Sequence, residues 1–133
     1  MKHKILVFVG TRPEAIKMAP VVKALRERDD LFEVTLLSTG QHREMLMQTL
    51  GDFALEPDIN LDLMTANQSL AQLSAQLMTS IDGVLARYLP DIVLVQGDTT
   101  TVMAASLCAF YRGIPCGHIE AGLRSYNMHA PFP

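Results

Sequence analysis

The sequence contains little that could cross-link a fold or attach it to a polyanion. It has 2 cysteines and no tryptophan in 133 residues, which excludes a disulfide-rich scaffold. Its 11 basic and 14 acidic residues give a net charge of −3 without a basic block, so we expect no nucleic-acid partner. The longest unbroken apolar run, Ile5–Val9, is far shorter than the roughly 20 residues that cross a bilayer. With no signal-peptide cleavage site either, we expect a cytoplasmic protein with no membrane partner.

The sequence also lacks the spacing of a metal site. Neither cysteine has a second Cys or a His at ligand spacing, and Cys116–His118 alone is too weak a pattern for zinc. We therefore predict no metal. Cys108 and Cys116 lie in apolar or strand-like segments, so we expect both thiols to be buried and unreactive. Several methionines fall on predicted helices and are expected to fill the core: Met18, Met45, Met47, Met78 and Met103.

An apolar fraction of 49% in a chain of one domain's usual size predicts an ordinary hydrophobic core. Apolar runs alternate with segments of helical spacing, and successive runs start about 24–32 residues apart, as in strand–helix–strand units. Runs that are apolar on both faces indicate strands covered on both sides. We predict an α/β fold over residues 1–133, a doubly wound, Rossmann-like parallel sheet. The predicted strands are 5–9, 34–37, 59–63, 92–95 and 116–119.

Each of the main predicted helices begins at a capping signal. A Thr-x-x-Glu box with Pro in the first turn opens one helix, and a Ser-x-x-Gln box opens another. Either Asp98 or Thr99 caps a third helix. The apolar stripe of the longest helix is expected to run from Leu70 to Tyr88. The predicted helices are about 12–28, 44–50, 70–88 and 100–111.

Polar clusters follow four of the predicted strands. In parallel sheets, ligands bind beyond the carboxyl ends of the strands, where the connecting loops face one crevice. We therefore expect these clusters to meet at one edge. The clusters are Gly10–Glu14, Thr39–Arg43, Gln96–Thr101 and Glu120–Arg124.

The first cluster is suited to an anion. Gly10 allows a tight turn at a helix N-terminus, where free N–H groups and the helix dipole favour negative charge. Arg12 could clamp a phosphate, and Lys17 faces the same end of the helix. The loop matches neither the dinucleotide nor the Walker pattern. The alternatives are that Arg12 pairs with Glu14 and that Lys17 is only solvated.

Two carboxylates could carry acid–base chemistry. Asp98 and Glu120 follow neighbouring predicted strands, and two carboxyl groups in one partly desolvated cleft can have their pKa values pushed apart. The alternatives are that Asp98 caps a helix and that Glu120 pairs with Arg124. His118 should point to the same face as Glu120 if the strand continues, or else it packs as a strand residue.

Four segments together resemble the non-hydrolysing UDP-N-acetylglucosamine 2-epimerases. They are GTRPEAIKMAP at 10–20, TGQHREML at 39–46, QGDTTT at 96–101 and GHIEAGLR at 117–124. The resemblance runs in order over essentially the whole chain. It implies the amino-terminal half of a two-domain, GT-B-type architecture. It also implies a cofactor-free isomerase that interconverts UDP-N-acetylglucosamine and UDP-N-acetylmannosamine for cell-envelope polysaccharide precursors, by elimination of UDP and re-addition.

The resemblance also implies roles for individual residues. Asp98 and Glu120 would be the catalytic acid–base carboxylates. Gln41 and His42 would belong to a possible second nucleotide-sugar site. Substrate-binding roles fall to Arg12, Lys17, Thr99, His118 and Arg124. Family members form homodimers through this domain, so we expect self-association.

The chain ends at Pro133, before a glutamate pair that follows in the family, and it lacks the family's carboxy-terminal nucleotide-binding domain. We therefore expect residues 1–133 to fold but not to turn over substrate alone. Two other functions remain open. One is half of a GT-B glycosyltransferase, which would transfer a sugar to an acceptor. The other is a non-catalytic nucleotide-sugar-binding domain.

Overall fold

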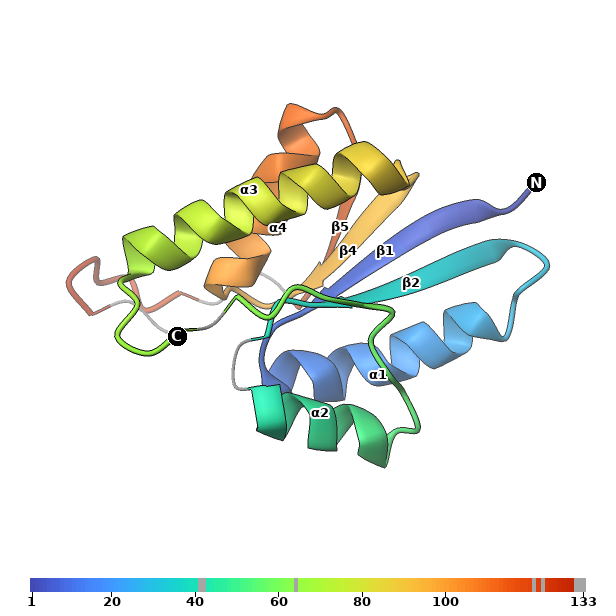
Figure 1. Cartoon of the computed structure of the whole chain (residues 1–133), viewed down its shortest axis with the longest axis horizontal. Helices are drawn as coiled ribbons and strands as arrows, with labels where there is room; N and C mark the ends of the chain where they lie inside the picture. The colour runs from blue at the N-terminus through green and yellow to red at the C-terminus, as the bar shows by residue number, and fades with distance from the viewer. Residues whose placement is uncertain (41–42, 64, 121, 123, 131–133) are drawn as a thin grey trace.

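The computed structural model describes residues 1–40, 43–63, 65–120, 122 and 124–130. In this part of the chain, a five-stranded sheet of order β3-β2-β1-β4-β5 lies between two layers of helices (Figure 1). Every paired strand runs parallel to its neighbour, which confirms the predicted fold class. The strands are β1 (His3–Val9), β2 (Phe32–Ser38), β3 (Ile59–Asn60), β4 (Ile92–Gln96) and β5 (Cys116–Ile119).

Helices cover both faces of the sheet, as the two-sided apolar runs predict. One face carries α1 (Arg12–Arg26) and α2 (Arg43–Asp52), and the other carries α3 (Leu70–Tyr88) and α4 (Thr100–Tyr111) (Figure 1). The central strand β1 supplies both layers, because successive side chains alternate between faces. Its odd-numbered residues 5, 7 and 9 pack with α1 and α2, while residues 6 and 8 pack with α3 and α4. No helix of the described residues is long and apolar enough to cross a membrane.

The helix ends follow the capping signals closely. In α3, the Ser69 and Gln72 side chains each accept a hydrogen bond from the other residue's backbone N–H. Of the two predicted caps of α4, the structure shows Thr99 and not Asp98. The Thr99 hydroxyl accepts from the N–H of Val102 at 3.4 Å. Helix α1 ends at Arg26, two residues before the predicted end.

Three expectations about burial are wrong. Cys116 is exposed, because β5 is the outer strand of the sheet and its side chain lacks a covering layer. Leu70 is 75% exposed, since it lies in the first turn of α3, beyond the end of the sheet. Met45 and Met103, expected in the core, are 50% and 51% exposed.

Strand β3 is shorter than predicted. It pairs with β2 over two residues only and ends at Asn60. Asp62 has a positive φ of 50°, which turns the chain away from the extended conformation. The edge nevertheless remains tied to β2, because the N–H of Leu61 donates to the carbonyl of Ser38 at 2.9 Å.

The strand order creates a topological switch point between β1 and β4. From β1 the chain proceeds through α1 to β2 on one side, and from β4 it proceeds through α4 to β5 on the other. Because these two connections diverge, a crevice opens beyond the carboxyl ends of β1 and β4. The clusters after these two strands, Gly10–Glu14 and Gln96–Thr101, therefore flank the expected ligand site.

Candidate active site

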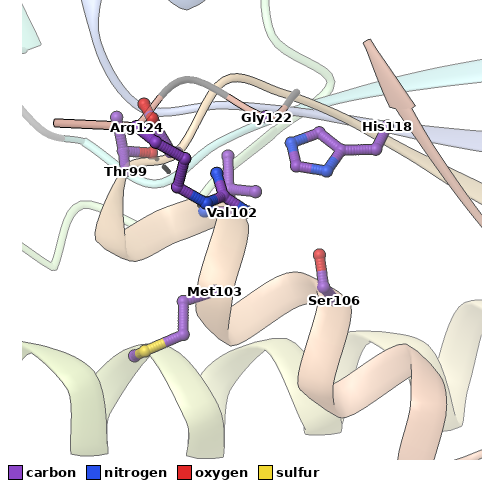
Figure 2. Close-up of a pocket in the computed structure, with 8 residues that line it drawn as sticks. Thr99, Val102, Met103, Ser106, His118, Gly122 and Arg124 are labelled. Atoms are coloured by element: carbon purple, nitrogen blue, oxygen red, sulfur yellow. Dashed lines mark hydrogen bonds between the residues drawn. The ribbon is translucent and has the colours of Figure 1, made fainter. Parts of the chain in front are cut away.

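Two hollows lie side by side at the carboxyl edge of the sheet. One has a volume of about 510 Å³ and is lined by Thr11, Arg12, Pro13, Met45 and Thr99. The other, of about 500 Å³, lies over α4 and is lined by Asp98, Thr99, Val102, Met103, Ser106, His118, Gly122 and Arg124 (Figure 2). Thr99 lines both, so the cap of α4 stands between them. We call them the Arg12 hollow and the Asp98 hollow.

The Arg12 side chain is available to a ligand. It is exposed, and within the described residues its guanidinium makes no hydrogen bond or ion pair. The alternative pairing with Glu14 does not occur, since the Glu14 carboxylate is directed to Gly10, Thr11 and Thr99. An unpaired guanidinium at the edge of a hollow can bind a phosphate through two parallel hydrogen bonds.

The sequence predicts free backbone N–H groups beside Arg12, and the structure does not show them at Gly10 and Thr11. The N–H groups of Gly10 and Thr11 are not free for an anion, because both donate to Oε2 of Glu14, at 3.0 Å and 2.5 Å. The Thr11 hydroxyl donates to the same oxygen at 2.7 Å. The helix end is thus already satisfied by a carboxylate of the chain itself. Any anion in the Arg12 hollow depends on the guanidinium more than on these two amides.

Glu14 is the buried carboxylate of the site, and sequence reasoning missed this role. Its side chain is 1% exposed, and its Oε1 accepts from the Thr99 hydroxyl at 2.8 Å. Burial raises the pKa of Glu14, and hydrogen bonds from Thr11, Thr99 and Gly10 offset part of that rise. The capping box signalled the bond to Thr11, but no local pattern signals a bond to a residue 85 positions away.

Asp98 stands on the loop after β4, directly before the cap of α4. The loop turns at Gly97, whose φ of +79° is a conformation that L side chains rarely adopt. A ring nitrogen of His118, Nε2, contacts the carbonyl oxygen of Gly97 and joins β5 to this loop. Figure 2 shows His118, which projects from β5, and Arg124 among the residues that line the Asp98 hollow. The Asp98 side chain is exposed.

The Glu120 side chain contacts α1 and does not lie on the same face of β5 as His118. Strand β5 ends at Ile119, and Glu120 has a positive φ of 56°, so the expected strand alternation between His118 and Glu120 stops there. Its Oε1 forms an ion pair with Nζ of Lys17, a residue 103 positions away. The structure thus gives Glu120 a different partner from Arg124, and Lys17 is more than a solvated lysine.

The loop after β2 is tied to the same edge. The hydroxyls of Thr39 and Thr101 share a buried hydrogen bond of 2.9 Å, which joins the end of β2 to the first turn of α4. Gln41 and His42, expected at a second nucleotide-sugar site, lie outside the described residues. Among the residues with described side chains, no three His, Cys, Asp or Glu groups are placed to hold a metal ion.

Besides the buried Glu14, the arrangement offers the cations Arg12, Lys17 and Arg124 and the carboxylates of Asp98 and Glu120 along one edge of the sheet. The Lys17 and Glu120 side chains are 42% and 44% exposed, and Asp98 is exposed as well. The partly desolvated cleft expected around the two carboxylates is therefore not closed by the described residues alone. The edge thus combines a guanidinium, a group suited to binding anions, with two carboxylates, a group type that serves in acid–base catalysis.

Comparisons with known proteins identify a family to which the chain is similar. A family model described as UDP-N-acetylglucosamine 2-epimerase matches residues 23–133. A UDP-N-acetylglucosamine 2-epimerase of Neisseria meningitidis is 51% identical over 130 residues, which is 98% of this chain and 35% of the relative. The enzyme of that name from Escherichia coli K12 is 49% identical over 98% of this chain and 34% of its own length.

Solved structures give the same result. A Listeria monocytogenes protein described as a UDP-N-acetylglucosamine 2-epimerase matches with a TM-score of 0.92 and 52% identity, over 100% of this chain and 35% of that one. The Neisseria meningitidis enzyme, solved bound to UDP-GlcNAc, matches with a TM-score of 0.91 and 51% identity, over 98% and 35%. The chain therefore spans about a third of the length of the relatives that it matches.

Proposed function

Because the chain belongs to the UDP-N-acetylglucosamine 2-epimerase family, we propose that it acts in the interconversion of UDP-N-acetylglucosamine and UDP-N-acetylmannosamine. It is the amino-terminal domain of a GT-B-type enzyme whose second domain supplies most of the contacts to uridine. Cytoplasmic action in the synthesis of cell-envelope polysaccharide precursors fits this substrate. The reaction needs no cofactor.

The reaction proceeds by elimination and re-addition. A base takes the proton from C2 of the sugar, the electrons of the C2–H bond form a C1=C2 double bond, and the C1–O bond breaks as UDP leaves. UDP then adds back to C1 of the 2-acetamidoglucal while an acid returns a proton to the other face of C2. This chemistry requires two proton-transfer groups and a cation near the departing diphosphate.

The described residues support an assignment of these tasks. Arg12, whose guanidinium pairs with none of the described residues, binds the diphosphate, and Asp98 and Glu120 transfer the protons. Lys17 forms an ion pair with Glu120 and holds its carboxylate beside α1. The single observation that carries the assignment is this Lys17–Glu120 contact, because it brings α1 and the end of β5 to one place.

The walls of the Asp98 hollow fit the remaining part of the substrate. Thr99, His118 and Arg124 line it and bind the sugar or its phosphates, and apolar contact from Val102 favours the sugar's less polar face (Figure 2). Gln41 and His42 belong to a second nucleotide-sugar site.

Self-association is part of the proposal. Helix α4 carries four exposed apolar side chains at helical spacing, where polar residues are usual on a free face. They are Met103, Leu107, Phe110 and Tyr111, which are 51%, 37%, 77% and 67% exposed. A second copy of this chain is the occupant that we assign to the face. Sedimentation should show a dimer that Phe110→Asp dissociates and that Leu31→Asp, on the far side of the sheet, does not.

Activity is tested best in a chain of the relatives' full length. Residues 1–133 are joined to the part of the Escherichia coli enzyme that follows its matched segment. This chimaera is expected to convert UDP-N-acetylglucosamine to its manno epimer and to exchange the C2 proton with solvent. The 133-residue chain by itself is expected to bind UDP weakly without turnover. A folded, UDP-binding chimaera with no exchange at C2 would contradict the proposal and favour a binding domain.

A further inference from the structure

Glu14 joins the two hollows of the candidate site. Its Oε2 accepts from the backbone of Gly10 and from the backbone and hydroxyl of Thr11, all on the loop after β1. Its Oε1 accepts from the hydroxyl of Thr99, on the loop after β4. One buried side chain therefore spans the switch point and ties the loop of Arg12 to the loop of Asp98.

The bond to Thr99 is not needed for capping α1. The capping box consists of the Thr11 N–H bound to the Glu14 carboxylate and the Glu14 N–H bound to the Thr11 side chain, and neither bond involves Thr99. The Thr99 hydroxyl, in contrast, donates to Glu14 while it accepts from the N–H of Val102, so its two bonds fix the first turn of α4 against the first turn of α1. The same residue lines both hollows.

We propose that Glu14 is a positioning residue that locks the loop carrying Arg12 to the loop carrying Asp98 and Thr99. Through this lock, the binding of an anion at Arg12 also changes the environment of the start of α4. The inference rests on the proposed function, in which that anion is the diphosphate of the substrate. The lock fixes the position of Arg12, which contacts the leaving diphosphate, relative to Asp98, which transfers a proton. Glu14 itself touches neither.

Substitutions separate the charge of Glu14 from its hydrogen bonds. In Glu14→Gln, the amide oxygen can replace Oε2, and the amide nitrogen can donate to the Thr99 hydroxyl, which turns to serve as acceptor. The lock is therefore kept without the charge. Glu14→Ala removes every bond. The matched control is Gln72→Ala, which removes the equivalent residue of the second capping box, on α3; Gln72 is not among the described residues that line either hollow.

The test is a titration of the 133-residue chain, labelled with ¹⁵N, against inorganic pyrophosphate and against UDP. In the wild-type chain, we expect amide signals of residues 10–15 and of residues 97–103 to shift with a single Kd. Glu14→Gln and Gln72→Ala should retain both groups of shifts, with Kd within about twofold of wild type. Glu14→Ala should lose the shifts at 97–103 and weaken binding at least fivefold.

Two results would overturn the lock. One is a folded Glu14→Ala chain in which both groups still shift at the wild-type Kd. The other is a Glu14→Gln chain that loses the shifts at 97–103 as Glu14→Ala does. Gln can replace the hydrogen bonds of Glu14, so the loss of those bonds would then not explain the effect.

Failure of the proposed function gives a different pattern. If neither probe shifts any amide of the wild-type chain, Arg12 does not bind a diphosphate here. The lock is then judged from hydrogen exchange without ligand, comparing Glu14→Ala with Gln72→Ala. Faster exchange that extends from residues 10–15 to residues 97–103 in Glu14→Ala alone supports the lock. Faster exchange confined to residues 10–15 overturns it.

Discussion

Gly40, on the loop after β2, is the position where a single methyl group should disturb the site edge most. The residue is buried and has a φ of +88°. A Cβ added there would lie 2.9 Å from Cα of Asp62 and 3.3 Å from the backbone nitrogens of Asp62 and Leu63. That backbone cannot withdraw easily, because the N–H of Leu63 donates to the carbonyl of Thr39 at 3.2 Å.

The cost of Gly40→Ala follows from these two features. A left-handed conformation costs an L residue about 1–2 kcal/mol, and over-packing costs about 1–3 kcal/mol. We expect the free energy of unfolding to fall by about 3 kcal/mol, which would lower Tm by roughly 10 °C in a domain of this size. The chain should remain folded, since domains are typically stable by about 5–15 kcal/mol.

Urea unfolding followed by circular dichroism measures this change, and a second glycine provides the control. Gly51 is exposed on α2, and an added Cβ would meet nothing within 4 Å. Gly51→Ala should therefore stabilise the chain by about 0.5–1 kcal/mol, because Ala favours the helix. If Gly40→Ala unfolds within 1 kcal/mol of wild type, the close packing of the loop after β2 against residues 61–63 is wrong.

Two further predictions concern titratable groups. Burial raises the pKa of Glu14 above its ordinary value of 4.5, so the folded chain holds this proton more tightly than the unfolded chain. The stability of wild type relative to Glu14→Gln should therefore be highest below pH 4.5 and fall as the pH rises toward the raised pKa; a difference that grows with pH would contradict this. The thiols should differ: Cys116, exposed on the edge strand, should react with iodoacetamide in the folded chain. Cys108 should stay protected until unfolding, because it is buried and burial raises its pKa, and equal labelling rates would refute this.

The fold could be predicted from the sequence because its signals are local. The run Ile5–Val9 is apolar at every position, which is typical of a strand covered on both faces, and all five residues are at most 4% exposed. The Ser69–Gln72 box likewise fixes the start of α3 within one turn of chain. The prediction for Cys116 failed because an apolar run does not indicate which strand lies at the edge of the sheet.

The candidate site could be predicted only in part. The topology rule brings the ends of β1 and β4 together, so Arg12 and Asp98 could be expected near each other. The partners of Glu14 and Glu120 could not, because each depends on a contact between residues 85 or 103 positions apart. No residue pattern around Glu120 predicts its positive φ, and this backbone conformation directs the side chain to Lys17.

In the proposed function, Asp98 and Glu120 move the protons of the reaction. The most direct measurement is incorporation of solvent deuterium at C2 of UDP-N-acetylglucosamine by the chimaera in D₂O. Asp98→Asn and Glu120→Gln are each expected to reduce incorporation at least a hundredfold, in line with the usual contribution of general acid–base groups. The matched controls Asp29→Asn and Glu27→Gln, exposed at the opposite edge of the sheet, should leave it unchanged. Incorporation at the wild-type rate in a chimaera carrying both Asp98→Asn and Glu120→Gln would contradict the account.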